Sequence, residues 1–130
     1  MDTLGLLVEV VVHSAGIQDR DGAKLIFERV KGKLSRMKKI WVDGAYAGEL
    51  EELAKKSFRW VLEVIKRDTE AKGFILLPQR WVVERTFGWL NKFRRLSKDY
   101  EYLLESSETM IRIAMIRIML KRLVHRALPP

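Results

Sequence analysis

The sequence contains no cysteine and only two histidines among its 130 residues. The absence of cysteine excludes a disulfide framework and a thiolate metal site. His13 ends an apolar run and His125 lies near the C-terminus, so the two histidines do not have the spacing of a metal-binding pair. A bound metal ion would therefore depend on oxygen ligands, chiefly the carboxylates of Asp and Glu.

Several motifs that mark common classes of protein are also missing. No GxSxG, P-loop or GxGxxG motif occurs, which argues against hydrolases, NTPases and dinucleotide-binding enzymes. The N-terminal stretch has no basic leader and carries Asp2 and Glu9 among its apolar residues, which is not typical of a signal peptide. Residues 110–124 are the most apolar later segment, but they carry four cations, whereas a membrane span needs about 20 mostly uncharged residues. We therefore expect a soluble, cytoplasmic protein with no membrane partner.

Positive charge is in excess, with 25 Lys and Arg against 17 Asp and Glu and a net charge of +8. This balance favours polyanionic partners, because cationic side chains that contact phosphates release condensed counterions. A basic protein that binds no nucleic acid fits the charge alone equally well. The length and the hydrophobic fraction of 48% suit one compact domain with a single core.

The first half of the chain has the patterning of an α/β fold. Residues 4–13 (LGLLVEVVVH) form a continuous apolar run, which predicts a central strand buried on both faces. Helical spacing predicts a helix over residues 23–37, with capping side chains at residues 19–22. The far end of this helix is basic, which suits the helix dipole or a contact with phosphate, and a solvated face is the more common role.

Two further strands are expected, one over residues 40–43 and one over residues 59–66, with a short helix over residues 49–58 between them. Residues 67–79 are expected to connect to the next helix, with a short extended piece at residues 74–77. Three visible strands are few for such a sheet, and the first begins almost at residue 1. We therefore expect an N-terminally truncated sheet that is covered by helices.

The second half of the chain is expected to be helical. From Arg80 onward the periodicity predicts an amphipathic helix whose polar side is almost entirely cationic apart from Glu84. A last helix is expected after a cap at Ser106 or Ser107, with residues 110–124 in the core and their cationic heads reaching solvent. Residues 127–130 are expected to form a tail.

Two carboxylates occupy positions that suit metal chemistry. Asp43 ends a predicted strand and precedes a glycine loop, at the end of an open α/β sheet where ligands gather. Glu84 lies within the basic helix. Two-metal phosphoryl transfer needs oxygen ligands and basic groups that hold phosphates. By position alone, a turn aspartate and a surface salt bridge are the more common roles for these residues, and core packing is more common than base stacking for Trp81 and Trp89.

The segments VDGAYAG (residues 42–48) and LPQRWVVERTFGWLNKFRRLSKDYE (residues 77–101) resemble the catalytic core of bacterial insertion-sequence transposases of the IS4/IS5 superfamily. The resemblance also covers DTLGLLVEVVVHSAGIQDRDGA near the start and IRIAMIRIMLKRL near the end. It implies that residues 1–130 form part of a ribonuclease-H-like catalytic domain with a DDE triad. The second acid of that triad would be Asp43, and the third would be Glu84 of an R-x-x-x-E motif that begins at Arg80.

The resemblance further implies a site that binds Mg²⁺ or Mn²⁺ through Asp43 and Glu84. The residues that it assigns to DNA binding are Arg80, Arg85, Lys92, Arg94, Arg95 and Tyr46. The implied partners are DNA, as insertion-sequence ends and target, and a second copy or a companion transposase chain. The implied location is the nucleoid of a bacterial cytoplasm.

The chain departs from the family pattern at three places. The first catalytic Asp of the family lies upstream of the position of Asp2 and is not in this sequence. Asn91 stands where the family often has Lys or Arg, with Lys92 next to it, and Leu77 replaces a frequent tyrosine. We therefore predict the C-terminal part of a transposase that cleaves and joins DNA, with impaired activity alone. The alternatives are a DNA-binding or regulatory remnant without catalysis, and a fragment that folds poorly.

Overall fold

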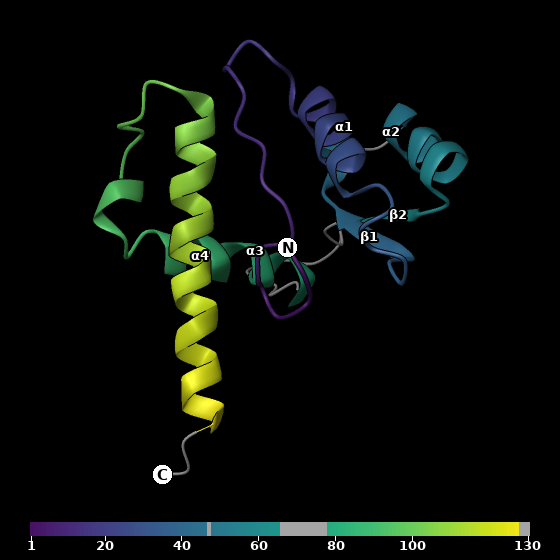
Figure 1. Ribbon diagram of the computed structural model, residues 1–130. Helices are drawn as coiled ribbons and strands as arrows, with labels where there is room; N and C mark the ends of the chain where they lie inside the picture. The colour runs from purple at the N-terminus through teal and green to yellow at the C-terminus, as the bar shows by residue number, and fades with distance from the viewer. Residues whose placement is uncertain (47, 66–77, 128–130) are drawn as a thin grey trace, which may run out of the picture. The chain divides into compact units, whose positions relative to one another are not determined.

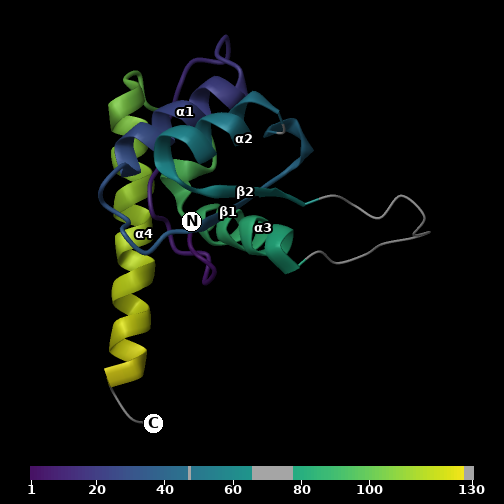
Figure 2. The same ribbon diagram turned by 90° about the vertical axis from the view of Figure 1, so that its right-hand side faces the viewer.

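The computed structural model describes residues 1–46, 48–65 and 78–127, shown in Figures 1 and 2. The described elements, in chain order, are α1 (Asp19–Val30), β1 (Lys39–Val42), the 3₁₀ turn η1 (Gly44–Tyr46), α2 (Glu49–Leu53), the π-helical turn η2 (Ala54–Phe58), β2 (Val61–Val64), α3 (Pro78–Leu90), the 3₁₀ turn η3 (Arg94–Leu96) and α4 (Leu104–Ala127). Helices and a small parallel sheet place the chain in the α/β class, as predicted.

The chain divides into two compact units. The sheet unit comprises His13–Trp81, and the helical unit comprises Met1–Val12 together with Val82–Pro130. The described buried residues form two clusters, one within each unit, rather than the single core that the chain length suggested.

In the sheet unit, β1 and β2 pair in parallel, with Lys39 opposite Val61 and Val42 opposite Val64. Parallel pairing requires a crossover, which α2 and η2 supply. The two strands and the intervening helical segment confirm the predictions for residues 40–43, 49–58 and 59–66. In both ribbon views, α1 and α2 lie on the same face of this sheet (Figures 1 and 2).

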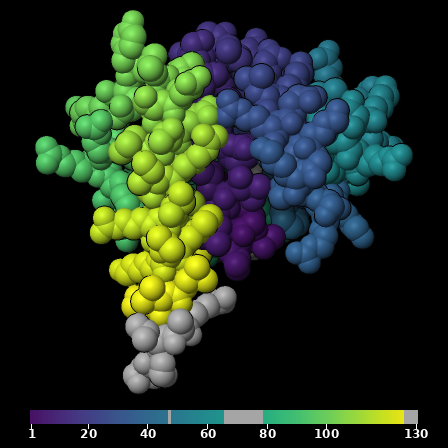
Figure 3. Space-filling model, viewed as in Figure 1, coloured from purple at the N-terminus to yellow at the C-terminus, as the bar shows by residue number. Residues whose placement is uncertain are grey.

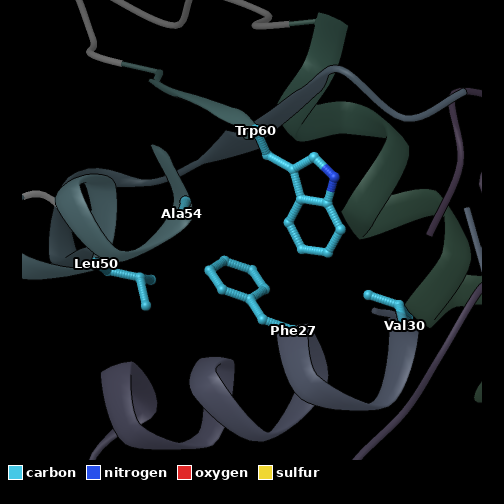
Figure 4. Close-up of a cluster of buried hydrophobic side chains, with 5 residues drawn as sticks. All are labelled: Phe27, Val30, Leu50, Ala54 and Trp60. Atoms are coloured by element: carbon cyan, nitrogen blue, oxygen red, sulfur yellow. The ribbon is translucent and has the colours of Figure 1, made fainter. Parts of the chain in front are cut away.

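The core of the sheet unit is built around aromatic rings from α1, from the end of η2 and from the residue just before β2. The Phe27 ring points into the space between Leu50 and Trp60 (Figure 4). It meets the Trp60 ring edge-on, with centroids 5.5 Å apart, and Trp60 stacks on Phe58 at 4.8 Å. These geometries are favourable for aromatic pairs and add to the hydrophobic stabilisation of the buried area.

Helix α1 differs from its predicted bounds at both ends. It begins at Asp19, because Gln18 occupies the cap position and the expected capping acids lie in the first turn. It ends at Val30, because Gly32 takes a left-handed conformation with φ of +74° that stops the helix. The cations of residues 31–39 therefore lie in the turn that leads into β1 rather than on the helix.

The predicted central strand over residues 4–13 is wrong. Residues 4–13 are described without strand pairing, and Leu4 and Val8 are exposed. The N–H of Val12 donates to the Glu108 carboxylate on α4, at 3.1 Å, rather than to a neighbouring strand. The segment runs beside α4 (Figure 1) and is tied to it by an ion pair between Arg112 and Glu9 at 2.8 Å. Apolar content alone did not distinguish this side-chain docking from a sheet ladder.

Helix α3 confirms the amphipathic helix that was predicted from Arg80, but it ends at Leu90. Phe93 has extended backbone angles and precedes η3, so the basic residues beyond position 90 do not continue the helix. Pro78 is the first helical residue, where its missing N–H costs no hydrogen bond. The expected connection at residues 67–77 lies outside the described residues.

Helix α4 begins at Leu104, so Ser106 and Ser107 lie inside it and do not cap it. The Ser107 hydroxyl instead donates to Asp99, and Glu108 is buried beside Arg112. The prediction of a core helix holds for one side only, on which Ala114 and Met115 are buried. Figure 3 shows α4 side chains at the surface, and the exposed large apolar ones are Leu104, Ile113, Ile116, Leu120, Leu123 and Val124. Within the described residues, no helix is long and apolar enough to cross a membrane.

Replacing Gly5 with alanine is expected to lower the free energy of unfolding of the helical unit by about 1–3 kcal/mol. Gly5 has a φ of +80°, and a Cβ there would lie 2.7 Å from the Thr86 hydroxyl oxygen and 3.1 Å from the Trp89 ring. Thr86 cannot withdraw, because it is 1% exposed and its hydroxyl hydrogen-bonds the Gly5 carbonyl. Urea unfolding measures the change.

Gly16→Ala is the matched control, because a Cβ at Gly16 meets nothing within 4 Å. Equal stability of the two variants would show that Gly5 is not held against Thr86.

Candidate functional site

Asp43 directly follows β1, at the carboxyl end of the parallel sheet. The residue is exposed, and one carboxylate oxygen accepts the N–H of Ala45 at 2.9 Å. Its carbonyl accepts the N–H of Tyr46 at 3.2 Å, so Asp43 opens the 3₁₀ turn that follows. The turn role therefore uses one carboxylate oxygen. The other has no hydrogen-bond partner among the described residues, which leaves an oxygen available to a ligand.

A second acid contributes to the surroundings of this loop. Burial raises the pKa of the Tyr46 phenol, and the carboxylates of Asp19 and Asp43 raise that pKa further. Arg20, the neighbour of Asp19 at the start of α1, donates from Nε to the Ala45 carbonyl at 2.9 Å. The start of α1 and the loop after β1 therefore approach each other. Asp19 was not predicted as a site residue, because an acid in a first helical turn is ordinarily explained by capping.

Glu84 is an exposed residue of α3, and Arg80 lies four residues earlier on the same helix. Residues separated by four positions share one face of a helix, so the two side chains project from the same side of α3. The R-x-x-x-E motif is thus carried on regular helical backbone. Its geometry presents one cation and one carboxylate together toward solvent.

Arg85 has a structural role in the helical unit. Its guanidinium donates to the Leu4 carbonyl at 3.0 Å and lies 5.0 Å from the centroid of the Trp89 ring. Arg122 of α4 covers the same ring at 4.2 Å. Trp89 therefore packs against two cations. Trp81 is 49% exposed, so the core packing expected for that residue is wrong. A phosphate contact by Arg85 would have to use the remaining guanidinium hydrogens.

The other predicted cations follow the end of α3. Lys92, Arg94 and Arg95 are exposed, and the last two belong to η3. Arg95 makes an ion pair with Glu101, which is mostly buried. Among the described residues, Lys92 and the Arg94 side chain make no ion pair, so their charge is available to an anionic partner.

The structure brings Asp43 and Tyr46 together, and the predicted site residues belong to both compact units. Asp43 and Tyr46 lie in one loop of the sheet unit, and Glu84 lies in the helical unit. Among the described residues, no group of three Asp, Glu or His side chains is placed to hold a metal ion. The available donors are nevertheless exposed carboxylates, the ligand type that Mg²⁺ and Mn²⁺ prefer. The described residues thus offer suitable donors, and no complete ligand set is found among them.

Comparison with known proteins gives two matches. The family described as "Transposase DDE domain" matches residues 1–119 of this chain. A curated protein of Burkholderia cepacia named "Putative transposase for insertion sequence element IS402" is 37% identical over 68 residues, which are 52% of this chain and 32% of that relative. The match therefore spans about a third of the length of the relative. No solved structure matches the chain.

Proposed function

This chain belongs to the transposase DDE domain family, and from that premise we propose that it takes part in metal-dependent DNA cleavage and strand transfer during transposition. Asp43 and Glu84 are the second and third acids of the proposed site. The observation that carries the proposal is the position of Asp43 at the carboxyl end of a parallel strand, with a carboxylate oxygen left over from its turn. The matched region includes both acids.

The chemistry assigns a role to each group of residues. DDE domains use divalent metal, and Mg²⁺ or Mn²⁺ bound by the acids would polarise a phosphoryl oxygen and lower the pKa of an attacking water. Asp43 would bind with the oxygen that the Ala45 N–H does not use. Lys92 and Arg94 would neutralise DNA phosphates near the third acid. Arg80 would do so from the same helical face as Glu84.

The proposed fold around these acids is that of ribonuclease H. The parallel pair β1 and β2 with a helical crossover is consistent with part of such a sheet. A DDE site needs a first acid on a further strand, and this sequence carries no residue that matches it. We propose that a longer transposase chain of the same family can supply this acid in the assembled complex.

Purified chain with Mg²⁺ is expected to leave supercoiled plasmid DNA uncut, because two of three acids cannot hold the metal ions in an active arrangement. Addition of a longer transposase of the same family, with its own second acid changed to asparagine, is expected to restore nicking. Nicking by that mixture should disappear when this chain carries Asp43→Asn. Gel separation of nicked from supercoiled plasmid measures both results.

Three outcomes separate the possibilities. Robust cleavage by the purified chain alone, abolished by Asp43→Asn, would show that no acid is missing. Cleavage by the mixture that survives Asp43→Asn would remove Asp43 from the site. Duplex binding without cleavage in any mixture, unchanged by Asp43→Asn and Glu84→Gln, would favour a DNA-binding remnant over an enzyme subunit.

A further inference from the structure

A basic hollow of about 390 Å³ lies at the amino end of the small sheet. Its lining includes Lys38, which directly precedes β1, and Arg59 and Trp60, which lie just before β2. Because the strands are parallel, their amino ends meet at one edge of the sheet. Asp43 follows β1 at the opposite edge. The hollow is therefore distinct from the proposed catalytic position.

The lining of the hollow carries positive charge without compensation. It contains three cations, Lys31, Lys38 and Arg59, and the hydroxyls of Ser35 and Ser57. No carboxylate is among its lining residues. Hydroxyls and ammonium or guanidinium groups are the donors that phosphate oxygens accept from, and the absence of acid leaves the site complementary to an anion.

Several other cations of the sheet unit are ion-paired. Lys24 pairs with Asp21 at 2.9 Å, and Lys56 pairs with Glu52 at the same distance. Even Lys39, next to the hollow in sequence, pairs with Glu63 across the sheet at 2.6 Å. Lys38 and Arg59 make no ion pair within the described parts of the chain. Their charges are thus available to an anionic partner.

The backbone conformation of Arg59 also supports a role for its side chain. Arg59 caps η2 in the left-handed conformation, with φ of +59° and ψ of +29°. Among the described residues it is the only one other than glycine with a positive φ. Glycine is the usual residue at such a cap, because a side chain there adds strain. A guanidinium thus occupies a position where the backbone favours glycine.

The aromatic residues that line the hollow limit the kind of ligand contact that is available. Lys31 Nζ lies 5.4 Å from the centroid of the Phe58 ring, and Phe58 stacks on Trp60. Trp60 is only 6% exposed and is engaged in the core, so it offers no free face on which a base could stack. The donors therefore suit phosphate oxygens, and the contact would be independent of base sequence.

We propose that this hollow binds the phosphodiester backbone of duplex DNA, as a second contact surface at the opposite edge of the sheet from Asp43. The choice of DNA as the polyanion rests on the proposed function. The site itself rests on the uncompensated cations, the hydroxyls and the strained cap. Lys38 and Arg59 are the residues that hold the phosphates.

The test is the salt dependence of duplex binding by the full chain, measured by fluorescence anisotropy. A plot of log affinity against log salt has a negative slope. Lys38→Ala/Arg59→Ala is expected to make this slope shallower by roughly 2, because each lost phosphate contact reduces its magnitude by about 0.9. The matched control is Lys24→Ala/Lys56→Ala, which removes the same charge from ion-paired positions. The control is expected to keep the wild-type slope.

A third variant separates folding from binding. Arg59→Gly is expected to unfold at the same temperature as wild type or higher, since glycine suits this cap. Its salt slope is expected to change by about half as much as that of the double variant, because one of the two cations is removed. Weaker binding with unchanged stability supports a role in DNA contact. A lowered unfolding temperature with an unchanged slope would make Arg59 a structural residue and overturn the proposal.

Two other results would also overturn it. Equal losses in the hollow variant and in its control would assign binding to net charge rather than to a site. Orthophosphate that binds the wild-type chain but not Lys38→Ala/Arg59→Ala, with no change in duplex affinity, would make the hollow a site for a free anion. Failure of cleavage in every mixture would leave these slopes unaffected, so the proposed function and the hollow are tested separately.

Discussion

Alanine in place of Trp60 is expected to lower the free energy of unfolding of the sheet unit by about 3–5 kcal/mol. Trp60 is 6% exposed and contacts the rings of Phe27 and Phe58, so truncation leaves a cavity between α1, η2 and β2. The buried cluster that contains Trp60 has few other large side chains, such as Phe27 and Leu50, so little can fill the cavity. An isolated domain of ordinary stability has only about 5–15 kcal/mol to lose.

Trp41→Ala provides the matched control on the adjacent strand. Trp41 is 41% exposed, so its truncation is expected to cost about 1 kcal/mol or less. Urea unfolding followed by circular dichroism compares the two variants. Hydrogen exchange then shows whether the loss is confined to the sheet unit. Similar losses for Trp60→Ala and Trp41→Ala would contradict the assignment of Trp60 to the core.

The parts of the fold that sequence predicted are those whose patterning is local. Strands β1 and β2 alternate between exposed and less exposed residues, which is the period of a half-buried strand. The crossover between them begins with the acids of α2, which suit a helix N-terminus. These features depend on neighbours along the chain, so they were visible without a structure.

The errors arose where distant partners decide the structure. Residues 4–13 have the apolar content of a buried strand, but their partners are Glu108 and Arg112, about a hundred positions away. These two residues bind backbone groups of the segment and the Glu9 side chain. Glu108 itself is buried, and its carboxylate accepts hydrogen bonds from Arg112 and from the Val12 N–H. No local pattern distinguishes these roles.

The candidate site was predictable in part for the same reason. Asp43 follows a strand and precedes a glycine, so its turn and its place at the end of the sheet could be inferred from nearby residues. The approach of Asp19 and Arg20 to the same loop depends on the packing of α1 and could not. Arg85 was assigned to DNA binding by the family resemblance, which did not reveal its contacts with Leu4 and Trp89.

Asparagine in place of Asp43 is expected to have opposite effects on DNA binding with and without metal. Without divalent metal, removal of a negative charge should strengthen duplex binding about two- to threefold, because the carboxylate repels phosphate. With Mg²⁺, the wild-type chain should gain about tenfold in affinity through a metal bridge between carboxylate and phosphate, and Asp43→Asn should lose that gain. Asparagine keeps an oxygen that accepts the Ala45 N–H, so the turn is preserved.

The proposal that Asp43 and Glu84 are metal ligands is tested most directly by the Mg²⁺ dependence of duplex affinity at constant ionic strength. Wild type, Asp43→Asn, Glu84→Gln and the control Glu52→Gln are compared; Glu52 is exposed and paired with Lys56. The predicted result is a Mg²⁺-dependent gain for wild type and Glu52→Gln that is absent from Asp43→Asn and Glu84→Gln. An identical response of all four proteins to Mg²⁺ would contradict a metal site built on these two acids.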